Sequence, residues 1–437
     1  MSKSDNSGLV EKVFQLKARN SRVKTEVIAG ATTFLTMVYI IFVNPNILSS
    51  AGMDHGAVFV ATCIAAAVGC MVMGVYANYP IALAPGMGLN AFFSFTVVGE
   101  LGYSWQVALG AVFLSGLVFL ALSIFQVREW IINSIPHSLR LSMGAGIGLF
   151  LGIIALKTAG IVVASPATLV TLGDLKSAEA LLAILSFLTI AVLSYKRIPG
   201  AVMIGILVST AIGLALGEAQ FNGVVSAPPS LLPTLGQLDI AGAFEVGMIS
   251  IIFAFLFVDL FDTAGTLLGV MHRGNLLDEA GRLPRMDRAL MADSSASIFG
   301  SVMGSSTTTS YVESSAGIEA GGRTGLTAVV CGILFFLCIF FSPLAATVPG
   351  YATAGALLYV AVLMTEGLAQ INWKDVTESA PAVIAAIMMP LSFSIANGIA
   401  LGFIAYTLIK VASGRREDVT LSVYVLCALF VAKFAFL

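Results

Sequence analysis

Long apolar stretches dominate the chain and limit the folds it can adopt. Predominantly apolar runs recur from Val27 to the C-terminus, and about 18 or more such residues suffice for a helix to cross a bilayer. Of the 437 residues, 58% are hydrophobic and 11% are charged, whereas soluble domains carry about 25% charged residues. The sequence therefore predicts an all-α, multi-pass membrane protein embedded in the lipid bilayer.

Polar breaks divide these apolar residues into fourteen predicted spans. The predicted spans cover residues 27–48, 56–78, 81–98, 105–125, 141–163, 178–195, 198–216, 245–271, 287–303, 306–320, 323–346, 352–369, 378–395 and 398–413. The first and eighth spans begin at Val27 and Glu245, 218 residues apart, which is half the chain. Because seven spans per half is an odd number, the second half must insert upside down. We therefore expect an inverted repeat.

The distribution of Lys and Arg predicts the orientation of the spans. A basic leader, residues 1–26, precedes the first span, and the loop at residues 217–244 contains no Lys or Arg. Because cytoplasmic loops carry an excess of these residues, we expect both ends of the fourteen-span unit to be cytoplasmic and this loop to lie outside. The last apolar segment, residues 414–437, either lies along the cytoplasmic interface or forms an additional span. The net charge of −2 argues against nucleic acid as a partner.

Two polar, glycine-rich segments interrupt the third and tenth predicted spans. Residues 84–93 read APGMGLNAFF, and residues 304–313 read GSSTTTSYVE. Broken helices at matched positions of two halves are typical of transporters that bind their substrate near the bilayer midplane. Gly86 and Gly88 leave backbone groups accessible in the first break. The breaks therefore predict a transporter and locate its site.

Acidic residues within the predicted spans are the strongest candidates for chemistry. An ionisable residue there costs about 2.5–3.5 kcal/mol on insertion scales, so it is a functional candidate by default. Asp259 and Asp262 are three residues apart and share a helix face, and two carboxylates this close disfavour joint ionisation. We predict Asp262 and Glu313 as substrate ligands, and Asp259, Asp262 and Glu313 as proton-coupling candidates. The alternatives are a structural role for Asp259 and a helix cap for Glu313.

Neighbouring residues complete the predicted site. The Asn90 amide offers both a donor and an acceptor, and Phe92 or Phe93 is placed to stack on a flat ligand, with interior packing as the alternative. Thr33 is expected near the same centre unless it bonds back to its own helix turn. Backbone or structural contributions to the site are predicted at Gly86, Gly88, Val312 and Gly265.

Motifs for other chemistry are missing from the sequence. It contains no CxxC pair, no Cys/His cluster and no Walker-type phosphate loop. The five cysteines fall within apolar runs and are interpreted as packing residues. No nucleophile–base pair is evident at membrane depth, so we predict no enzyme activity, no metal site and no cofactor.

The chain resembles the AzgA-type purine nucleobase permeases of the nucleobase–ascorbate transporter superfamily. The resemblance runs almost from end to end and rests on several motifs in the same order. These motifs are residues 29–37 (AGATTFLTM), the break at 84–93, residues 258–265 (VDLFDTAG), residues 311–314 (YVES) and residues 321–326 (GGRTGL).

The resemblance implies a fold, a mechanism and a set of ligands. It implies fourteen spans in two inverted repeats, with short antiparallel strands in spans three and ten. A core domain would comprise residues 27–125 and 245–346, and a gate domain residues 141–216 and 352–413. Asp262, Glu313 and Asn90 match the residues that bind the base. Proton symport, elevator-like movement of the core against the gate, a homodimer and a bacterial inner-membrane location are further expectations.

The chemistry of the predicted residues agrees with a purine substrate. Hypoxanthine, guanine and adenine are flat and edged with N–H donors, which carboxylates accept. General likeness favours hypoxanthine and guanine over adenine. Coupling to sodium is the alternative to protons, because carboxylates and hydroxyls also suit that ion. The rival function is transport of small anions, which half-helix N-termini attract but three nearby acids oppose.

Overall fold

The protein is predominantly helical. The computed structural model describes residues 8–124, 136–274, 276–277 and 283–436. The start of the predicted leader, the last residue of the fourth predicted span and parts of two loops therefore lie outside the described residues. The helices of the first half are α1 (Leu9–Phe14), α2 (Val23–Met37), α3 (Ile40–Ser49), α4 (His55–Val72), η1 (Met73–Ala77), α5 (Met87–Ala91), η2 (Phe92–Glu100), α6 (Trp105–Ile124), α8 (His137–Thr158), α9 (Ala178–Tyr195) and α10 (Ala201–Leu216).

The second half repeats this pattern of helices. Its elements are η3 (Gly242–Phe244), α11 (Val246–Arg273), α12 (Met286–Met303), α13 (Ser314–Glu319), α14 (Gly325–Leu337), η4 (Cys338–Phe341), α15 (Ser342–Thr347), α16 (Gly350–Met364), η5 (Thr365–Gln370), α17 (Val376–Leu391), α18 (Ile395–Ala412), η6 (Arg416–Asp418) and α19 (Leu421–Phe436). Every predicted span overlaps one of these helices or a short run of them, although strands occupy parts of the third, fifth and tenth spans. Apolar run length therefore located the elements well.

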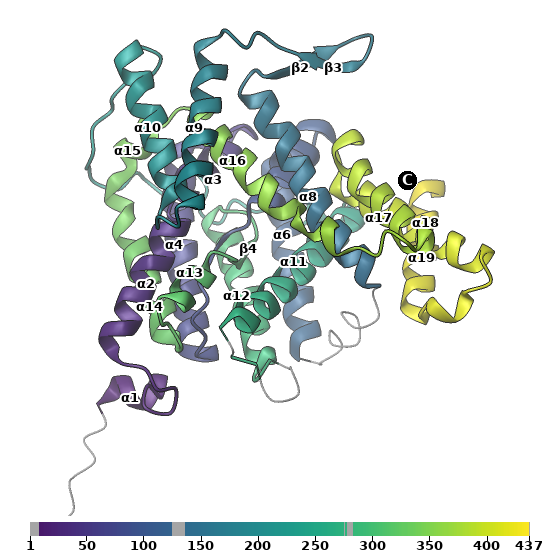
Figure 1. The fold of residues 1–437 in the computed structure, drawn as a ribbon, viewed down its shortest axis with the longest axis horizontal. Coiled ribbons are helices and arrows are strands. Elements are labelled where there is room, and N and C mark those ends of the chain that lie inside the picture. The colour runs from purple at the N-terminus through teal and green to yellow at the C-terminus, as the bar shows by residue number, and fades with distance from the viewer. Residues whose placement is uncertain (1–7, 125–135, 275, 278–282, 437) are drawn as a thin grey trace, which may run out of the picture.

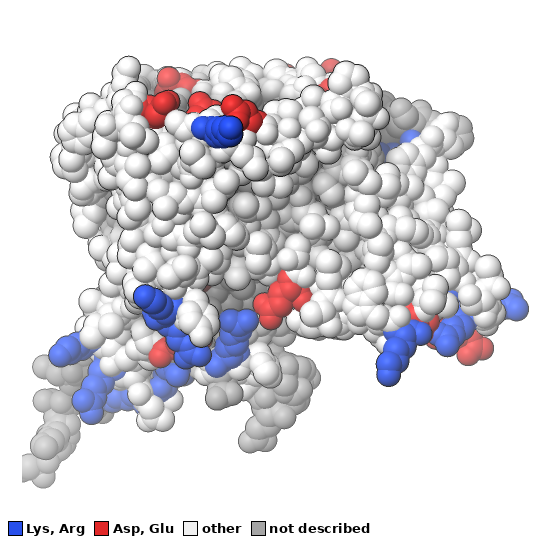
Figure 2. All heavy atoms as spheres, turned by 45° about the horizontal axis from the view of Figure 1, so that its top comes forward, with Lys and Arg blue, Asp and Glu red and all other residues white. Residues whose placement is uncertain are grey.

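Nine helices among the described residues are long and apolar enough to cross a membrane, and α10, α17 and α19 are shorter apolar helices. The interrupted third and tenth spans are not among them. Neither is α12, which is rich in Ser and carries Asp287 and Asp293. The number fourteen stays a prediction. Charged side chains gather at two opposite ends, with an almost uncharged belt between them (Figure 2). A bilayer would cover such a belt.

The helices pack as two groups. The first bundle comprises the helices and strands from α2 to α6 and from α11 to α14, and the second comprises α8, α9, α10, α16, α17 and α18. Within the first bundle, α2 and α14 lie side by side although they are far apart in the sequence (Figure 1). Contacts between the bundles are fewer and join α5 and α11 to α8, α2 to α10, α3 to α16, and α11 to α18. Each bundle thus combines segments from both halves of the chain.

Two three-residue strands occupy the breaks. β1 (Leu83–Pro85) and β4 (Thr308–Ser310) pair antiparallel, with Leu83 opposite Ser310 and Pro85 opposite Thr308. The strand pair is buried, and β4 lies near the middle of the molecule (Figure 1). The expected antiparallel strands in spans three and ten are confirmed.

A β-hairpin replaces the end of the fifth predicted span. That span was expected to reach residue 163, but α8 ends at Thr158, and β2 (Val162–Ser165) pairs with β3 (Leu169–Leu172). Gly160 has a φ of +67°. Glycine adopts this left-handed conformation easily and commonly terminates helices in this way. The β-branched residues beyond it favour strand geometry, so apolar character alone misassigned them.

The C-terminal segment lies alongside α18. The ammonium of Lys433, near the end of α19, donates to Asn397 Oδ1 at the start of α18, at 3.0 Å. Phe430 of α19 packs on Phe403 of α18, with ring centroids 5.8 Å apart. The two helices therefore run antiparallel, and α19 packs back along α18.

A buried carboxylate joins α2 to the start of α14 in the second half of the chain. Glu26, which is fully buried, accepts hydrogen bonds from the backbone N–H groups of Arg323 and Thr324 and from the Thr327 hydroxyl, at 3.0, 3.2 and 2.6 Å. These groups surround the start of α14, whose first N–H groups lack partners within the helix. Glu26 thus satisfies the start of α14 from α2, although the sequence placed it in the leader.

We expect the substitution Glu26→Ala to destabilise the protein. It leaves buried N–H groups without acceptors, at about 1–3 kcal/mol each. Thermal unfolding of the purified protein in detergent measures the loss, and Glu26→Gln, which keeps one acceptor oxygen, should fall between Ala and wild type. Glu319→Ala, which removes an exposed carboxylate from α13, is the matched control. Equal melting temperatures for the two alanine variants would contradict this role of Glu26.

Candidate functional site

The paired strands bring the two breaks together. Beyond the ladder, the Gly86 N–H donates to the Thr307 carbonyl at 2.9 Å, and the Tyr311 N–H donates to the Ala82 carbonyl at 3.0 Å. The Tyr311 hydroxyl donates to the Pro85 carbonyl at 2.6 Å. Each strand leads directly into a short helix, α5 after β1 and α13 after β4. The two breaks thus meet at one point, which we call the strand crossing, where backbone and side-chain hydrogen bonds join them at both ends of the strand pair.

Sharp helix ends aim the chain into this crossing. The residue after η1, Asn78, has a φ of 55°, and the residue after α12, Gly304, has a φ of 92°. At Gly304 a β-carbon would also overlap the backbone and side chain of Thr234. Glycine at position 304 is therefore required by both conformation and space, and it turns the chain from α12 toward β4.

A cavity of about 180 Å³ opens beside the strand crossing. One wall is polar and belongs to the first bundle, where the breaks and α11 contribute carboxylates, hydroxyls and backbone. The opposite wall is apolar and belongs to α16 of the second bundle. The lining residues are Gly86, Met87, Gly88, Asp262, Thr266, Thr309, Ser310, Tyr311, Val312, Glu313, Val360, Leu363 and Met364.

Two of the predicted carboxylates share this cavity. Glu313 accepts a hydrogen bond from the Tyr39 hydroxyl at 2.6 Å, and Tyr39 sits between α2 and α3, where the first span is interrupted. Within the described part of the chain, Asp262 has no hydrogen-bond partner. Asp262 therefore presents free acceptor oxygens to the cavity, while Tyr39 fixes one oxygen of Glu313.

Asp259 lies behind the strands, away from the cavity, and is 2% exposed. One of its oxygens accepts a long hydrogen bond from Ser297 at 3.4 Å, and the other has no partner among the described residues. Asp293 of α12 lies nearby and accepts from the hydroxyls of Thr263 and Ser310, both at 2.9 Å. Asp293 thereby joins α11, α12 and β4.

Asn90, Phe92 and Thr33 are not brought to the cavity wall. The Asn90 amide donates to Asn44 Oδ1 at 2.6 Å. Phe92 packs edge-on against Phe255, with centroids 5.0 Å apart, and Phe93 is also buried. Thr33 faces α13, where a β-carbon at Gly317 would overlap its hydroxyl oxygen. In this structure these side chains pack or bond within the protein, and their roles as ligands stay predictions.

The predicted small and backbone residues divide in the same way. Gly86, Gly88 and Val312 line the cavity. A β-carbon on Gly88 would overlap Ile147 of α8, so glycine allows the two bundles to approach closely here. Gly265 lies outside the lining, and none of the described atoms comes within 4 Å of the place a β-carbon would take.

Several site residues were missed from the sequence. Asp293 carried a usable signal, since it is an acid inside the ninth predicted span. Tyr39 and Tyr311 look like ordinary apolar positions, and only their hydrogen bonds reveal their roles. The α16 residues Val360 and Met364 carried no signal, because apolar residues are expected throughout a span.

Comparisons with known proteins cover nearly the whole chain. The permease family matches residues 24–401. The adenine permease AdeP of Escherichia coli K12 is 54% identical over 99% of this chain and 98% of its own length. The guanine/hypoxanthine permease PbuG of Bacillus subtilis is 47% identical over 97% of this chain and 99% of its own length.

Among solved structures, the transmembrane domain of the cyanobacterial bicarbonate transporter BicA aligns with a TM-score of 0.67 at 15% identity, covering 87% of this chain and 97% of that one. This likeness confirms the inverted-repeat fold, while the number of spans in each repeat stays a prediction. The chain is a multi-pass membrane transporter and not an enzyme. The predicted resemblance is confirmed, and the chain belongs to the permease family together with these adenine and guanine/hypoxanthine permeases.

Proposed function

We propose that the protein imports purine nucleobases by secondary active transport. The observation that carries this proposal is the cavity at the strand crossing, with two carboxylates on one wall and apolar side chains on the other. Relatives at 47–54% identity that are named for purine bases support the same substrate class.

The two walls suit the two surfaces of a purine. Asp262 and Glu313 offer acceptors to the N–H groups on the edge of the base, and backbone groups at Gly86 and Gly88 lie beside them. Val360 and Met364 provide an apolar surface for the flat face, in place of the ring stacking predicted for Phe92. A drug-sized ligand needs about 300–1,000 Å³, so a cavity of about 180 Å³ favours a smaller molecule such as a free base.

Similarity to named relatives bears on which base is carried. The adenine permease is 54% identical, and the guanine/hypoxanthine permease is 47% identical. This order favours adenine as the first base to test, ahead of the hypoxanthine and guanine that general likeness had favoured. All three bases remain within the proposed class.

We also propose that uptake is coupled to protons. Asp259 is buried and forms no ion pair with a described residue, and an ionised carboxylate in such surroundings is costly unless it is paired. Asp259, Asp262 and Glu313 are the proposed proton carriers, and sodium is the less favoured ion. The first bundle supplies every polar group of the cavity, which supports its movement as a core carrying the base past the second bundle as a gate. A homodimer and a bacterial inner membrane with cytoplasmic ends complete the proposal.

Small-anion transport is less well supported. The BicA likeness is at 15% identity and concerns the fold alone. An anion entering the cavity would meet Asp262 and Glu313, and like charges close together in an apolar setting repel strongly. A neutral, N–H-rich ligand avoids this repulsion.

Uptake measurements test the proposed function directly. We expect radiolabelled adenine to accumulate in cells that lack their own purine permeases and express this protein. Unlabelled adenine, guanine and hypoxanthine, added separately, rank the bases. A protonophore should abolish accumulation, whereas replacing sodium with choline should leave it unchanged. Failure of all three bases to be taken up or to compete would remove the proposal.

We expect Glu313→Gln and Asp262→Asn each to abolish most uptake without preventing membrane insertion. Each substitution replaces an acceptor oxygen by an NH2 group, and a hydrogen bond to a charged group contributes about 1.5–3 kcal/mol, or roughly 10- to 100-fold in affinity. Initial uptake rates are normalised to the amount of tagged protein in the membrane. Glu319→Gln and Asp174→Asn, at exposed positions, are the controls. Normal proton-driven uptake by both site variants would overturn the site.

The apolar wall gives a test based on size. Val360 is 6% exposed and lines the cavity, whereas Val362 on the same helix is 52% exposed and does not. We expect Val360→Trp to fill the cavity and to raise KM for the base by at least about tenfold, with Val362→Trp close to wild type. Val360→Ala should admit a purine with a bulkier substituent. Unchanged KM for a well-inserted Val360→Trp variant would show that α16 does not bound the site.

A further inference from the structure

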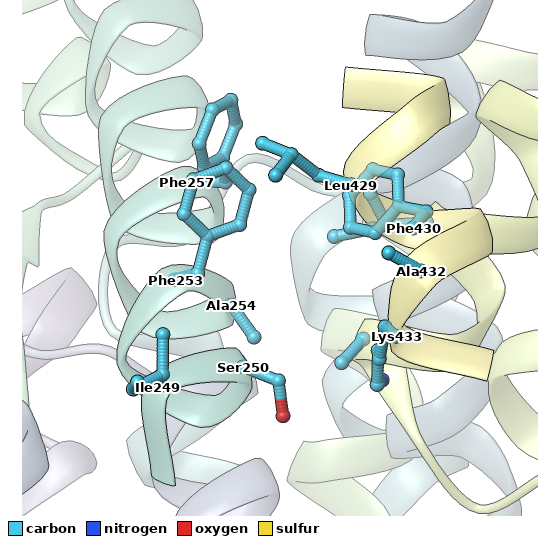
Figure 3. Close-up of a pocket in the computed structure, with 11 residues that line it drawn as sticks. Ile249, Ser250, Phe253, Ala254, Phe257, Leu429, Phe430, Ala432 and Lys433 are labelled. Carbon is cyan, nitrogen blue, oxygen red and sulfur yellow. The ribbon is translucent and has the colours of Figure 1, made fainter. Parts of the chain in front are cut away.

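A second, larger cavity lies along the N-terminal half of α11, before the acidic residues Asp259 and Asp262. It has a volume of about 410 Å³ and runs between α11 on one side and α18 and α19 on the other. Figure 3 shows the side chains of α11 facing those of α19 across it. Apart from Ser250 and Lys433, its lining is apolar: Ile249, Phe253, Ala254, Phe257, Ala396, Ile399, Leu429, Phe430 and Ala432. We call this cavity the α11–α19 groove.

The polar residues of the groove lie together at one end. Ser250 and Lys433 face each other there, and Phe257 and Leu429 lie at the other end (Figure 3). Among the described residues, the Lys433 ammonium donates one hydrogen bond, to Asn397 Oδ1 at 3.0 Å, lies 5.4 Å from the centroid of the Phe434 ring and forms no ion pair. A partly buried ammonium without a counter-charge is unfavourable, so this end of the groove favours an anion.

Another cavity, of about 380 Å³, adjoins the polar end of the α11–α19 groove and shares Ser250, Ala396 and Lys433 with it. Its wall adds hydroxyl groups from Thr96, Tyr103 and Ser394, and the carboxylate of Glu100. Glu100 is exposed and is not within ion-pair distance of Lys433. The adjoining cavity is thus a polar space next to an unpaired cation.

The groove has the depth of one membrane leaflet. Its polar end lies beside the first turn of α11 and the turn between η2 and α6, where spans end. From Val246 to Phe257, α11 rises about 16 Å, and half of the hydrocarbon core is about 15 Å. The apolar part therefore extends from the membrane boundary toward the midplane, on the outer side in the predicted orientation.

We propose that the α11–α19 groove binds an anionic phospholipid of the membrane. One acyl chain lies along Phe253, Phe257 and Leu429, the phosphate pairs with Lys433, and the rest of the head group enters the adjoining polar cavity. The volume falls within the range of small-molecule sites, about 300–1,000 Å³. Charge, depth and apolar lining each match a part of this one molecule.

A purine base fits this groove poorly. A base needs acceptors for its N–H groups, and the walls of the groove offer only Ser250 at one end. The proposal rests on the membrane location of the chain and does not depend on which solute is transported. Because α11 belongs to the first bundle and α18 to the second, a lipid in the groove would contact both bundles.

Binding of defined lipids to the delipidated, full-length protein tests the proposal. We expect dioleoyl phosphatidylglycerol to raise the melting temperature in detergent and to remain bound in native mass spectra. Lys433→Gln should weaken its binding by about tenfold, as expected for loss of a charge-assisted bond. Lys176→Gln, in an exposed loop, is the charge control. Dioleoylglycerol, which lacks the phosphate, and glycerol phosphate, which lacks the chains, should each fail to reproduce the shift.

A second pair of variants tests the path of the acyl chain. Ala432 lines the groove, whereas Ala435 on the same helix does not. Ala432→Trp should displace the lipid and Ala435→Trp should not, with both proteins melting at the wild-type temperature in the absence of lipid. Wild-type lipid binding by Lys433→Gln or by Ala432→Trp would overturn the proposal, as would a full shift with glycerol phosphate alone.

Discussion

The antiparallel pairing of β1 and β4 is the constraint on which the site depends. Breaking two helices at membrane depth leaves backbone N–H and C=O groups that lipid cannot satisfy. The strands pair with each other, and side chains satisfy the backbone groups at their ends. The Cys70 thiol donates to the Leu83 carbonyl and its sulfur accepts from the Leu83 N–H, both at 3.2 Å. The Ser314 hydroxyl oxygen accepts from the Ala82 N–H at 3.0 Å. Cys70 therefore does more than the packing role its sequence context indicated. Because every strand end is held, the two short helices that follow start at fixed places beside one cavity.

The buried acids differ in what they bond, and this difference separates structural from ligand roles. Asp293 is occupied by the hydroxyls of Thr263 and Ser310 and so ties β4 to α11 and α12. Asp262, one turn from Asp259 on α11, lines the cavity and accepts no hydrogen bond from a residue that the structure describes. An acceptor already satisfied by the protein gains little from a ligand, whereas an unsatisfied one gains a full hydrogen bond. The free oxygens of Asp262 are therefore better placed than those of Asp293 to accept hydrogen bonds from a substrate.

Sequence patterns predicted the positions of the helices well, but they predicted less well which side chains meet in the folded protein. Apolar run length and polar breaks located nearly every helix, because bilayer thickness leaves few alternatives. The strands β1 and β4 were expected from the family resemblance, whereas the hairpin of β2 and β3 was not expected. Asp262 and Glu313 were predicted as ligands because an acid in a span is costly, and both line the same cavity in the structure, but their role as ligands stays a prediction. Asn90 and Thr33 were expected at the cavity but point into the packed interior, because residue type does not reveal which helix face meets which neighbour. The contribution of Val360 arises only from the packing of α16 against the first bundle, between residues far apart in sequence.

The unequal chemistry of the two cavity walls bears on how the proposed transport cycle could work. Hydrogen bonds are directional. If polar groups of both bundles held the base, the bonds to one bundle would have to break whenever the bundles moved relative to each other. Here the acids, hydroxyls and exposed backbone all belong to the first bundle, and α16 offers only Val360, Leu363 and Met364. Apolar contacts are non-directional, so a surface of this kind can be exchanged for another at small cost. Gly88 adds to this by letting the first bundle lie close to Ile147 of α8 without a side chain between them. We infer that the base stays bound to the first bundle during transport, while α16 of the second bundle provides an apolar surface past which the first bundle moves.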